Sequence, residues 1–276
     1  MLPLVSVIMG VYNIDNEALL RKSVMSVLNQ TFANFEFIIC DDGSQNNTFL
    51  WLQSISQVDK RIVLLKNESN KGLAYTLNKC LTHAKGEFIA RQDADDLSQQ
   101  DRFIKQVEFL LNNPDISFVA SNCNLYDERG VWGARVFPYK PEPKDFLFKV
   151  PFQHGALMFR RNCLAEVGGY HVSKRTRRTE DYDLLMRLYA NKFRGANLQE
   201  YLYDFLENKA AMKRRKYRYR IDEAITRYKG FKLLGLMPKG IPYVIKPLIV
   251  GLIPMRLLNM LKMRYYKQDG LRGLKN

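Results

Sequence analysis

The first 121 residues alternate between short apolar runs and longer stretches with helical periodicity, and this alternation limits the possible folds more than any other feature. Apolar runs predict strands at 4–9, 35–40, 61–66, 87–90 and 116–121. Apolar residues at helical spacing predict helices between them, at 16–29, 47–57, 73–84 and 101–112. This order predicts an α/β domain with a mostly parallel central sheet and helices on both faces.

The second half of the chain is less regular. Short strands are predicted at 122–127, 134–137, 157–160 and 201–206, and one helix at 180–191. A connector with one helical turn is predicted at 141–151. The sequence shows no internal repeats.

Acidic residues stand where several of these elements begin or end. Asp41-Asp42 follows one predicted strand, Asp93-Ala94-Asp95-Asp96 follows another, and Glu180-Asp181 opens a predicted helix. Open α/β sheets bind ligands outside the carboxyl ends of their strands. Alternate residues of extended chain face the same side, so Asp93 and Asp95 are expected to face one ligand. Their oxygens suit Mg²⁺ or Mn²⁺ held together with substrate phosphates, although the tetrapeptide alone would be better explained as a solvated turn.

Two common nucleotide-binding motifs are missing. Neither GxGxxG nor GxxxxGK[ST] occurs, which disfavours a dinucleotide-binding domain and a P-loop NTPase. Gly10-Val11-Tyr12-Asn13 follows the first predicted strand instead. Tyr12 could stack on a nucleotide base, or it could simply pack at the sheet edge.

The order of these motifs resembles that of the family 2 inverting glycosyltransferases of GT-A fold, of the bacterial surface-polysaccharide type. The resemblance covers about residues 4–206 and rests on five motifs, each weak alone. They are Val5-Ser6-Val7-Ile8-Met9-Gly10-Val11-Tyr12-Asn13, Asp41-Asp42-Gly43-Ser44, Asn70-Lys71-Gly72, Asp93-Ala94-Asp95-Asp96 and Thr179-Glu180-Asp181.

The resemblance implies a role for each matching residue. Asp41 would accept a hydrogen bond from the nucleotide base, Lys71 would lie near the nucleotide, and Asp93 would bind on the ribose side. Asp95 would be the ligand of Mn²⁺ or Mg²⁺ at the diphosphate. Asp181 would be the catalytic base that deprotonates the acceptor hydroxyl as it attacks the anomeric carbon.

Simpler structural roles remain open for several of these residues. Asp41 could cap the following helix, as Asp42 or Ser44 could. Lys71 could be a solvated turn lysine. Glu180 is expected to contact the acceptor or the protein, and first-turn acids also complement a helix dipole. Asp96 is expected to begin the next helix or to support its neighbours.

Two further features lie close to these motifs. The basic segment 174–178 directly precedes the Thr179-Glu180-Asp181 motif, and could close over a diphosphate or remain a solvated charge run. His154 matches a recurrent segment of the family under the acceptor site. A structural, hydrogen-bonded histidine is expected there, with a third metal ligand as the alternative.

The basic charge is confined to one end of the chain. Residues 1–207 hold 25 Lys and Arg against 25 Asp and Glu, whereas residues 208–276 hold 18 against 3. Residues 1–207 are therefore predicted to be the catalytic domain, and 208–276 a basic, amphipathic, helical membrane-associating region. The apolar stretch 241–261 is interrupted by Pro, Lys and Arg, and its longest uninterrupted apolar run, 248–253, is too short for a spanning helix. It is expected to lie at an anionic membrane surface.

The remaining features concern location. The N-terminus lacks the basic start of a signal peptide. The four cysteines form no CxxC pair and are expected to be buried thiols in a reducing compartment, since metal-ligand spacing is absent. A peripheral protein on the cytoplasmic face of the membrane is expected.

The resemblance, together with the basic tail, implies a metal-dependent hexosyl- or N-acetylhexosaminyltransferase. It would move a sugar from a nucleotide-diphospho-sugar, with a UDP-sugar favoured, to a lipid-linked glycan in polysaccharide or lipopolysaccharide synthesis. Two alternatives remain. A nucleic-acid-binding protein could use the basic tail, but no nucleic acid is expected because the neutral domain has an acidic edge. The other alternative is a sugar nucleotidyltransferase. Such enzymes usually carry a glycine-rich basic loop after the first strand, whereas Gly10-Val11-Tyr12-Asn13 is neither glycine-rich nor basic.

Overall fold

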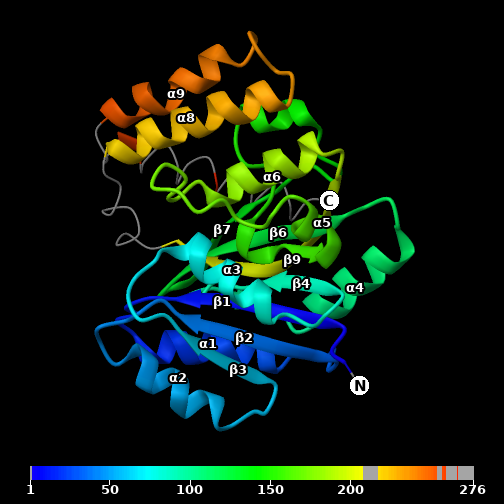
Figure 1. Cartoon of the computed structure of the whole chain (residues 1–276), viewed down its shortest axis with the longest axis vertical. Helices are drawn as coiled ribbons and strands as arrows, with labels where there is room; N and C mark the ends of the chain where they lie inside the picture. The colour runs from blue at the N-terminus through cyan, green and yellow to red at the C-terminus, as the bar shows by residue number, and fades with distance from the viewer. Residues whose placement is uncertain (1, 208–216, 254–256, 259–265, 267–276) are drawn as a thin grey trace.

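The computed structural model describes residues 2–207, 217–253, 257–258 and 266, and its centre is a nine-stranded sheet (Figure 1). The strands are β1 (Val5–Val11), β2 (Phe35–Asp41), β3 (Ile62–Lys66), β4 (Phe88–Arg91), β5 (Leu97–Ser98), β6 (Phe118–Asp127), β7 (Gly130–Arg135), β8 (Met158–Arg160) and β9 (Gly195–Leu206). The helices are α1 (Glu17–Leu28), α2 (Thr48–Ser56), α3 (Leu73–His83), α4 (Arg102–Asn112), α5 (Arg161–Glu166), α6 (Glu180–Ala190), α8 (Arg218–Leu233) and α9 (Ile241–Leu252). Two 3₁₀ turns, η1 (Pro143–Leu147) and η2 (His154–Ala156), complete the set.

The strand order is β3-β2-β1-β4-β8-β6-β9-β5, with β7 paired to β6. The strands β1 to β4 are parallel to one another, as predicted from the alternation of strand and helix. In the second half β6 and β9 are parallel, while β5, β7 and β8 run antiparallel to their partners. The carboxyl ends of β2, β1 and β4 therefore meet at one edge of the sheet.

Helices cover both faces of the sheet, each over its own hydrophobic core. One core joins α1, α2 and α4 to strand residues such as Val7 and Met9. The other joins α3, α5, α6 and α8 to residues such as Ile8. Successive residues of β1 thus point to opposite cores, which explains its continuous apolar sequence. All four cysteines are buried free thiols, as predicted.

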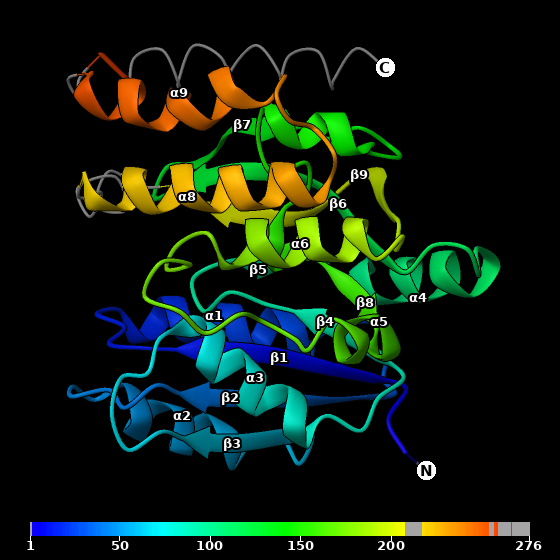
Figure 2. The same cartoon turned by 45° about the horizontal axis from the view of Figure 1, so that its top comes forward.

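The helices α6, α8 and α9 lie one above another at one end of the molecule (Figure 2). Gly230 of α8 lies so close to α6 that a Cβ there would come within 2.1 Å of the Met186 sulfur. The hydroxyls of Thr226 in α8 and Thr179 before α6 are 3.0 Å apart. The predicted boundary after residue 207 remains a prediction, but α8 is packed onto the rest of the fold.

Several elements differ from the prediction. The segments 116–121 and 122–127 form one strand, β6. The strand predicted at 201–206 begins earlier, at Gly195, and the strand predicted at 134–137 is β7, at Gly130–Arg135. The strand β5 and the helix α5 were not predicted. Gly195 has low strand propensity, but it lies against Phe118, whose ring a Cβ at Gly195 would approach to 2.2 Å. Tertiary packing therefore determines where β9 begins.

Candidate functional site

The predicted site residues gather at the carboxyl edge of β2, β1 and β4. Asp41 is the last residue of β2 and pairs in register with Val11 of β1, so Tyr12 follows directly beside it. Arg91 ends β4, and Asp93 lies two residues beyond. Tyr12 is 44% exposed, which leaves its ring available to a ligand. The sheet topology thus brings residues from three separate parts of the sequence to one edge.

Asp41 is buried and only partly hydrogen-bonded. Its Oδ2 accepts a hydrogen bond from the Ser44 backbone N–H at 3.0 Å. Within the described residues its Oδ1 is buried and has no hydrogen-bond partner. A buried acceptor of this kind is costly unless a ligand donates to it, which suits the predicted contact with a nucleotide base.

The neighbouring Asp42 organises the turn that carries Lys71. Its Oδ1 accepts hydrogen bonds from the Lys71 backbone N–H and the Asn67 side-chain amide, each at 2.8 Å. Its Oδ2 accepts from the Gly72 N–H at 2.8 Å. Gly72 has φ 91°, a left-handed conformation that favours glycine. The exposed Lys71 side chain is therefore held at the site by a fixed backbone.

The acidic cluster after β4 rests on a buried arginine. Arg91 is fully buried, and its Nη2 lies 2.6 Å from Oδ1 of Asp93. The Asp93 backbone N–H donates to the Tyr203 hydroxyl oxygen at 3.2 Å. Gly155 lies directly beside these groups, because a Cβ there would come within 2.8 Å of Asp93 Oδ2 and 2.1 Å of the Tyr203 hydroxyl. Asp93 is thus held in one position from several sides.

The other two carboxyls of the cluster differ in exposure. Asp95 is partly exposed, and its backbone carbonyl accepts a hydrogen bond from the Tyr126 hydroxyl at 2.7 Å. Asp96 is buried, and its Oδ1 accepts from the Leu206 N–H at 2.8 Å. Burial, with the negative charges of Asp95 and Asp93, raises the pKa of Asp96 well above its usual value. Asp96 therefore supports the strand β9, as expected of a supporting residue.

The carboxylate oxygens at this edge of the sheet suit a divalent cation whose remaining ligands come from the substrate and water. Among the described residues, no group of three or more His, Cys, Asp or Glu side chains could hold a metal by itself. Asp93 and Asp95 supply carboxylate oxygens in a partly exposed position. Mg²⁺ and Mn²⁺ are commonly bound by one or two carboxylates together with substrate phosphates and water.

Two carboxyls with raised pKa values open α6. Burial, together with the charge of Asp181, raises the pKa of Glu180 to about 7. Burial, together with the charges of Asp93 and Glu223, raises the pKa of Asp181 to about 6. Asp93 is thus close enough to affect the ionisation of Asp181, although 88 residues separate them in the sequence. The structure brings the acidic cluster and the predicted base into one site.

His154 lies beneath this site and forms the predicted structural hydrogen bond. Its Nε2 is 2.9 Å from the Tyr170 hydroxyl. Burial, with the positive charge of Arg91, lowers the pKa of His154 to about 3, so its ring is neutral. The Tyr170 hydroxyl in turn lies within the field of Asp93, Glu180 and Asp181.

A cleft of about 750 Å³ opens beside these residues. Its lining includes Tyr12, Asp42, Lys71 and Glu180, and most of the basic segment 174–178. Asp41, Asp93 and Asp95 are not among its lining residues. A neighbouring pocket of about 400 Å³ contains Asp181, and Arg178 and Tyr219 line both spaces. Tyr12 and Lys71, two of the predicted nucleotide-binding residues, and the predicted base therefore face adjoining spaces.

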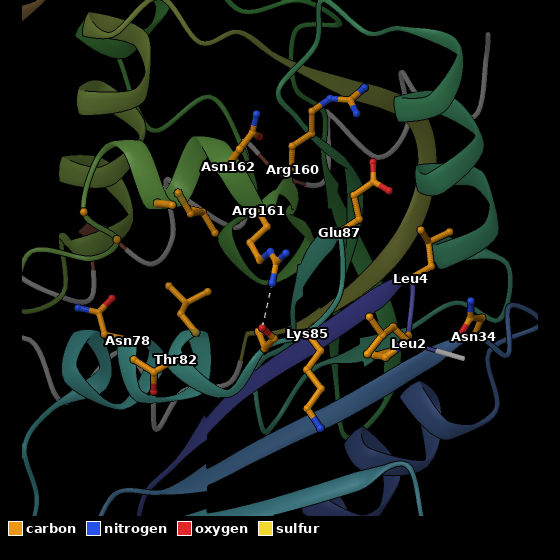
Figure 3. A pocket seen from close by; sticks show the side chains of 17 residues that line it. Leu2, Leu4, Asn34, Asn78, Thr82, Lys85, Glu87, Arg160, Arg161 and Asn162 are labelled. Carbon is orange, nitrogen blue, oxygen red and sulfur yellow. Dashed lines mark hydrogen bonds between the residues drawn. The ribbon is translucent and has the colours of Figure 1, made fainter.

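A larger cavity, of about 1320 Å³, lies away from this edge (Figure 3). It lies near the amino ends of β1 and β4. The N-terminal segment, the last turns of α3 and the helix α5 surround it. Lys85, Glu87, Arg160 and Arg161 line it, and Arg161 donates to the Ala84 carbonyl at 3.3 Å. It contains none of the predicted site residues, so size alone does not identify the functional site.

Sequence reasoning missed several residues that shape the site. Arg91 was not singled out, because a buried arginine at a strand end is visible only when its partner Asp93 is placed. A charged residue directly after an apolar run was the available signal. Tyr219 was not singled out as a site residue, since its place beside Arg178 in the lining of both spaces depends on tertiary packing.

Comparison with known proteins identifies the family. The sequence model of the family described as glycosyl transferase family 2 matches residues 6–175. The chain belongs to this family. This glycosyltransferase is 43% identical over 267 residues to the putative glycosyltransferase EpsE of Bacillus subtilis (strain 168), covering 96% of this chain and 94% of that protein.

A second relative of the glycosyltransferase has a more specific name. It is 28% identical over 248 residues to an Escherichia coli protein named UDP-Gal:alpha-D-GlcNAc-diphosphoundecaprenol beta-1,3-galactosyltransferase. The match covers 83% of this chain and 84% of that protein.

The fold of the glycosyltransferase also has solved counterparts. The mannosyltransferase PcManGT from Pyrobaculum calidifontis, solved with GDP-Man and Mn²⁺, superposes with a TM-score of 0.64 at 18% identity. The match covers 99% of this chain and 85% of that one. The predicted GT-A fold is thereby confirmed.

Proposed function

We propose that this glycosyltransferase is an inverting, metal-dependent enzyme that transfers a hexosyl or N-acetylhexosaminyl group from a UDP-sugar to a lipid-linked glycan in surface-polysaccharide synthesis. The observation that carries the proposal is that Asp181 lies close to the acidic cluster around Asp93. The negative charge of Asp93 contributes to raising the pKa of Asp181 to about 6. The related galactosyltransferase, whose name includes UDP-Gal and a diphosphoundecaprenol acceptor, supports the choice of donor and acceptor class.

The proposed roles follow from the positions of the side chains. Asp41 accepts an N–H of the uracil at its buried, unpaired Oδ1, and the exposed face of Tyr12 packs against the base. Lys71 and the basic segment 174–178 face the diphosphate across the cleft. Asp93, held by Arg91, binds on the ribose side. Asp95 would hold Mn²⁺ or Mg²⁺, which supplies positive charge to the departing diphosphate.

Asp181 acts as the general base. A carboxyl with a pKa of about 6 is more basic than an ordinary aspartate, yet it remains mostly ionised at neutral pH. The Asp181 carboxylate removes the proton of the acceptor hydroxyl while that oxygen attacks the anomeric carbon. One displacement inverts the configuration at that carbon. Glu180, in the adjoining cleft, contacts the acceptor.

A donor screen and one matched pair of variants test the proposal. Release of nucleoside diphosphate from a range of nucleotide sugars is measured with Mn²⁺ and with chelator. Asp181→Asn should bind UDP as the wild type does but transfer no sugar. Asp183→Asn is the control, because Asp183 lies in the same helical turn but pairs with Arg187 at 2.8 Å. Normal transfer by Asp181→Asn would rule out the proposed base.

We propose a peripheral membrane location on the basis of α9. Among the described residues, no helix is both long and apolar enough to cross a membrane. Ile241, Ile245, Ile249 and Leu252 are 44–74% exposed along one side of α9, and Lys246 is exposed beside them. Aliphatic side chains flanked by lysines suit the surface of an anionic bilayer. The predicted interfacial segment was 241–261, and its part after residue 253 lies largely outside the described residues.

Sedimentation with vesicles tests this location. The protein should sediment with vesicles containing anionic lipid and much less with neutral phosphatidylcholine vesicles. Ile245→Asp with Ile249→Asp should reduce vesicle binding without changing donor hydrolysis. Stronger retention on polynucleotide than on anionic vesicles would contradict the proposed location.

A further inference from the structure

The pocket that contains Asp181 is built in part by the C-terminal helix α8. Lys149 lies on one side of the pocket, Asp181 lies at the start of α6, and Tyr219, Arg220 and Arg227 come from α8. The family sequence model ends at residue 175, before these α8 residues. This wall of the pocket is therefore a feature of this chain beyond the matched segment.

The helix α8 is fixed firmly enough to form a binding surface. Arg227 donates from Nη1 to the Leu147 carbonyl at 3.0 Å, and its guanidinium lies 5.1 Å from the centre of the Tyr182 ring. Phe231 packs edge-on against the same ring. These contacts hold α8 beside the start of α6, so Arg220 and Tyr219 keep a defined position relative to Asp181.

The pocket carries more positive than negative side chains. Its lining contains four cations, Lys149, Arg178, Arg220 and Arg227, and two carboxyls, Asp181 and Glu223. Glu223 is shared, since one of its oxygens is 3.1 Å from Arg220 and the other is 3.1 Å from Arg227. One carboxylate cannot neutralise two guanidiniums. The pocket next to the proposed base therefore has a surplus of positive charge.

The arginines of α8 differ in what they can offer a ligand. The Arg227 side chain is 6% exposed and donates to backbone carbonyls. The Arg220 side chain is 19% exposed at the pocket. Tyr219 lines both the pocket and the larger cleft, with the Arg178 guanidinium 5.0 Å from its ring centre. Its ring thus presents an aromatic surface at the boundary between the two spaces.

We propose that this pocket binds the acceptor through an anionic group attached to the acceptor sugar. Arg220 and Lys149 bind the anion, and Tyr219 packs against the sugar ring. The inference rests on the proposed function, because a base at Asp181 places the acceptor hydroxyl in this pocket. A diphosphate on a lipid carrier and a carboxylate on an acidic sugar share the required chemistry.

Three acceptors with the same alkyl chain test the proposal with the full-length enzyme. They are an alkyl diphosphate of N-acetylglucosamine, the octyl glycoside of N-acetylglucosamine, and octyl glucuronide. The wild type should use an anionic acceptor with a kcat/KM at least tenfold above that of the neutral glycoside. Preference for the diphosphate identifies a carrier phosphate as the anion, and preference for the glucuronide identifies an acidic sugar. Equal use of all three overturns the proposal.

Variants separate binding of the anion from support of the fold. Arg220→Gln and Lys149→Gln should each raise the KM for the preferred anionic acceptor about tenfold and leave kcat little changed. Neither should change the neutral glycoside KM, the affinity for UDP or donor hydrolysis. Arg220→Lys should restore part of the loss, because it keeps the charge. Lys229→Gln, at an exposed lysine of the same helix, is the control.

The outcomes distinguish this inference from the proposed function. If the wild type releases nucleoside diphosphate from no nucleotide sugar, the proposed function fails. If it transfers sugar but Arg220→Gln lowers the use of neutral and anionic acceptors equally, only the inference fails. Tyr219→Ala should raise the KM for all three acceptors, whereas Tyr219→Phe should keep near wild-type values, since stacking requires the ring alone.

Discussion

The guanidinium of Arg91 and the carboxylate of Asp93 form an ion pair, with Nη2 2.6 Å from Oδ1. The Arg91 side chain is fully buried, whereas that of Asp93 is 28% exposed. The pair thus joins the protein interior to the ligand edge of the sheet. A buried positive charge behind the acidic cluster offsets the repulsion among Asp93, Asp95 and Asp96.

Removing the arginine should destabilise the protein. Arg91→Met leaves Asp93 without its cation, and breaking a buried ion pair costs about 3–5 kcal/mol. Because Asp93 is partly solvated, we expect a loss of about 2–3 kcal/mol in the free energy of unfolding, measured by urea denaturation. Asp93→Asn should lower kcat/KM strongly with a smaller loss of stability.

A double variant separates the loss of stability from the loss of activity. Arg91→Met combined with Asp93→Asn removes both charges, so it should be more stable than Arg91→Met alone while remaining inactive. Additive losses of stability in the double variant would show that the ion pair does not hold the cluster.

Gly155 should be intolerant of any side chain. A Cβ there would come within 2.1 Å of the Tyr203 hydroxyl and 2.8 Å of Asp93 Oδ2. Gly155→Ala should therefore displace both groups, destabilise the fold by about 1–3 kcal/mol and lower kcat/KM. In contrast, a Cβ at Gly10 first meets the flexible Leu73 side chain at 3.0 Å. If Gly155→Ala were no more harmful than Gly10→Ala, the close packing under Asp93 would be unimportant.

The N-terminal half of the fold could be predicted from sequence because its signals are local. The apolar run at 35–40 became β2, one residue longer, and the helix predicted at 101–112 became α4, Arg102–Asn112. The positions of Asp41 and Asp93, at or just after the ends of strands, follow from the apolar runs at 35–40 and 87–90. Placing them side by side requires only the parallel sheet that the alternation predicts.

The rest depends on contacts between distant segments. No local pattern shows that Gly195 begins a strand, since its position is decided by Phe118. The basic composition after residue 207 predicts a surface region, yet α8 packs on α6 and lines the pocket of Asp181. A net charge over a segment does not reveal that Arg227 is buried against Tyr182.

The rate of transfer should depend on the ionisation of Asp181. The pKa of its carboxyl is raised to about 6, so kcat/KM should rise with pH through an apparent pKa near 6. An ordinary aspartate would place this limb near pH 4. Glu223→Gln removes one of the negative charges that raise this pKa, so the limb should move to lower pH. An unchanged limb would assign the ionisation to another group.

The free energy of unfolding should also depend on the ionisation of these carboxyls, but it should fall as pH rises, whereas kcat/KM should rise. Folding raises the pKa values of Glu180 and Asp181, so the folded state binds more protons than the unfolded state between about pH 4 and 7. Their contribution to the free energy of unfolding therefore falls as pH rises through this window. Glu180→Gln with Asp181→Asn should melt a few degrees higher than wild type at pH 8, and the gain should shrink at pH 4. A gain that did not vary with pH would have another cause.

Asp95 and Asp96 should differ sharply in their effect on metal dependence. Chelation should abolish transfer by the wild type, and added Mn²⁺ should restore it. Asp95→Ala should require at least tenfold more Mn²⁺ for half-maximal rate, because it removes a proposed ligand. Asp96→Asn should keep the wild-type requirement, since Asp96 is buried and an amide oxygen can still accept from the Leu206 N–H. Equal Mn²⁺ requirements in the two variants would show that Asp95 is not the metal ligand proposed here.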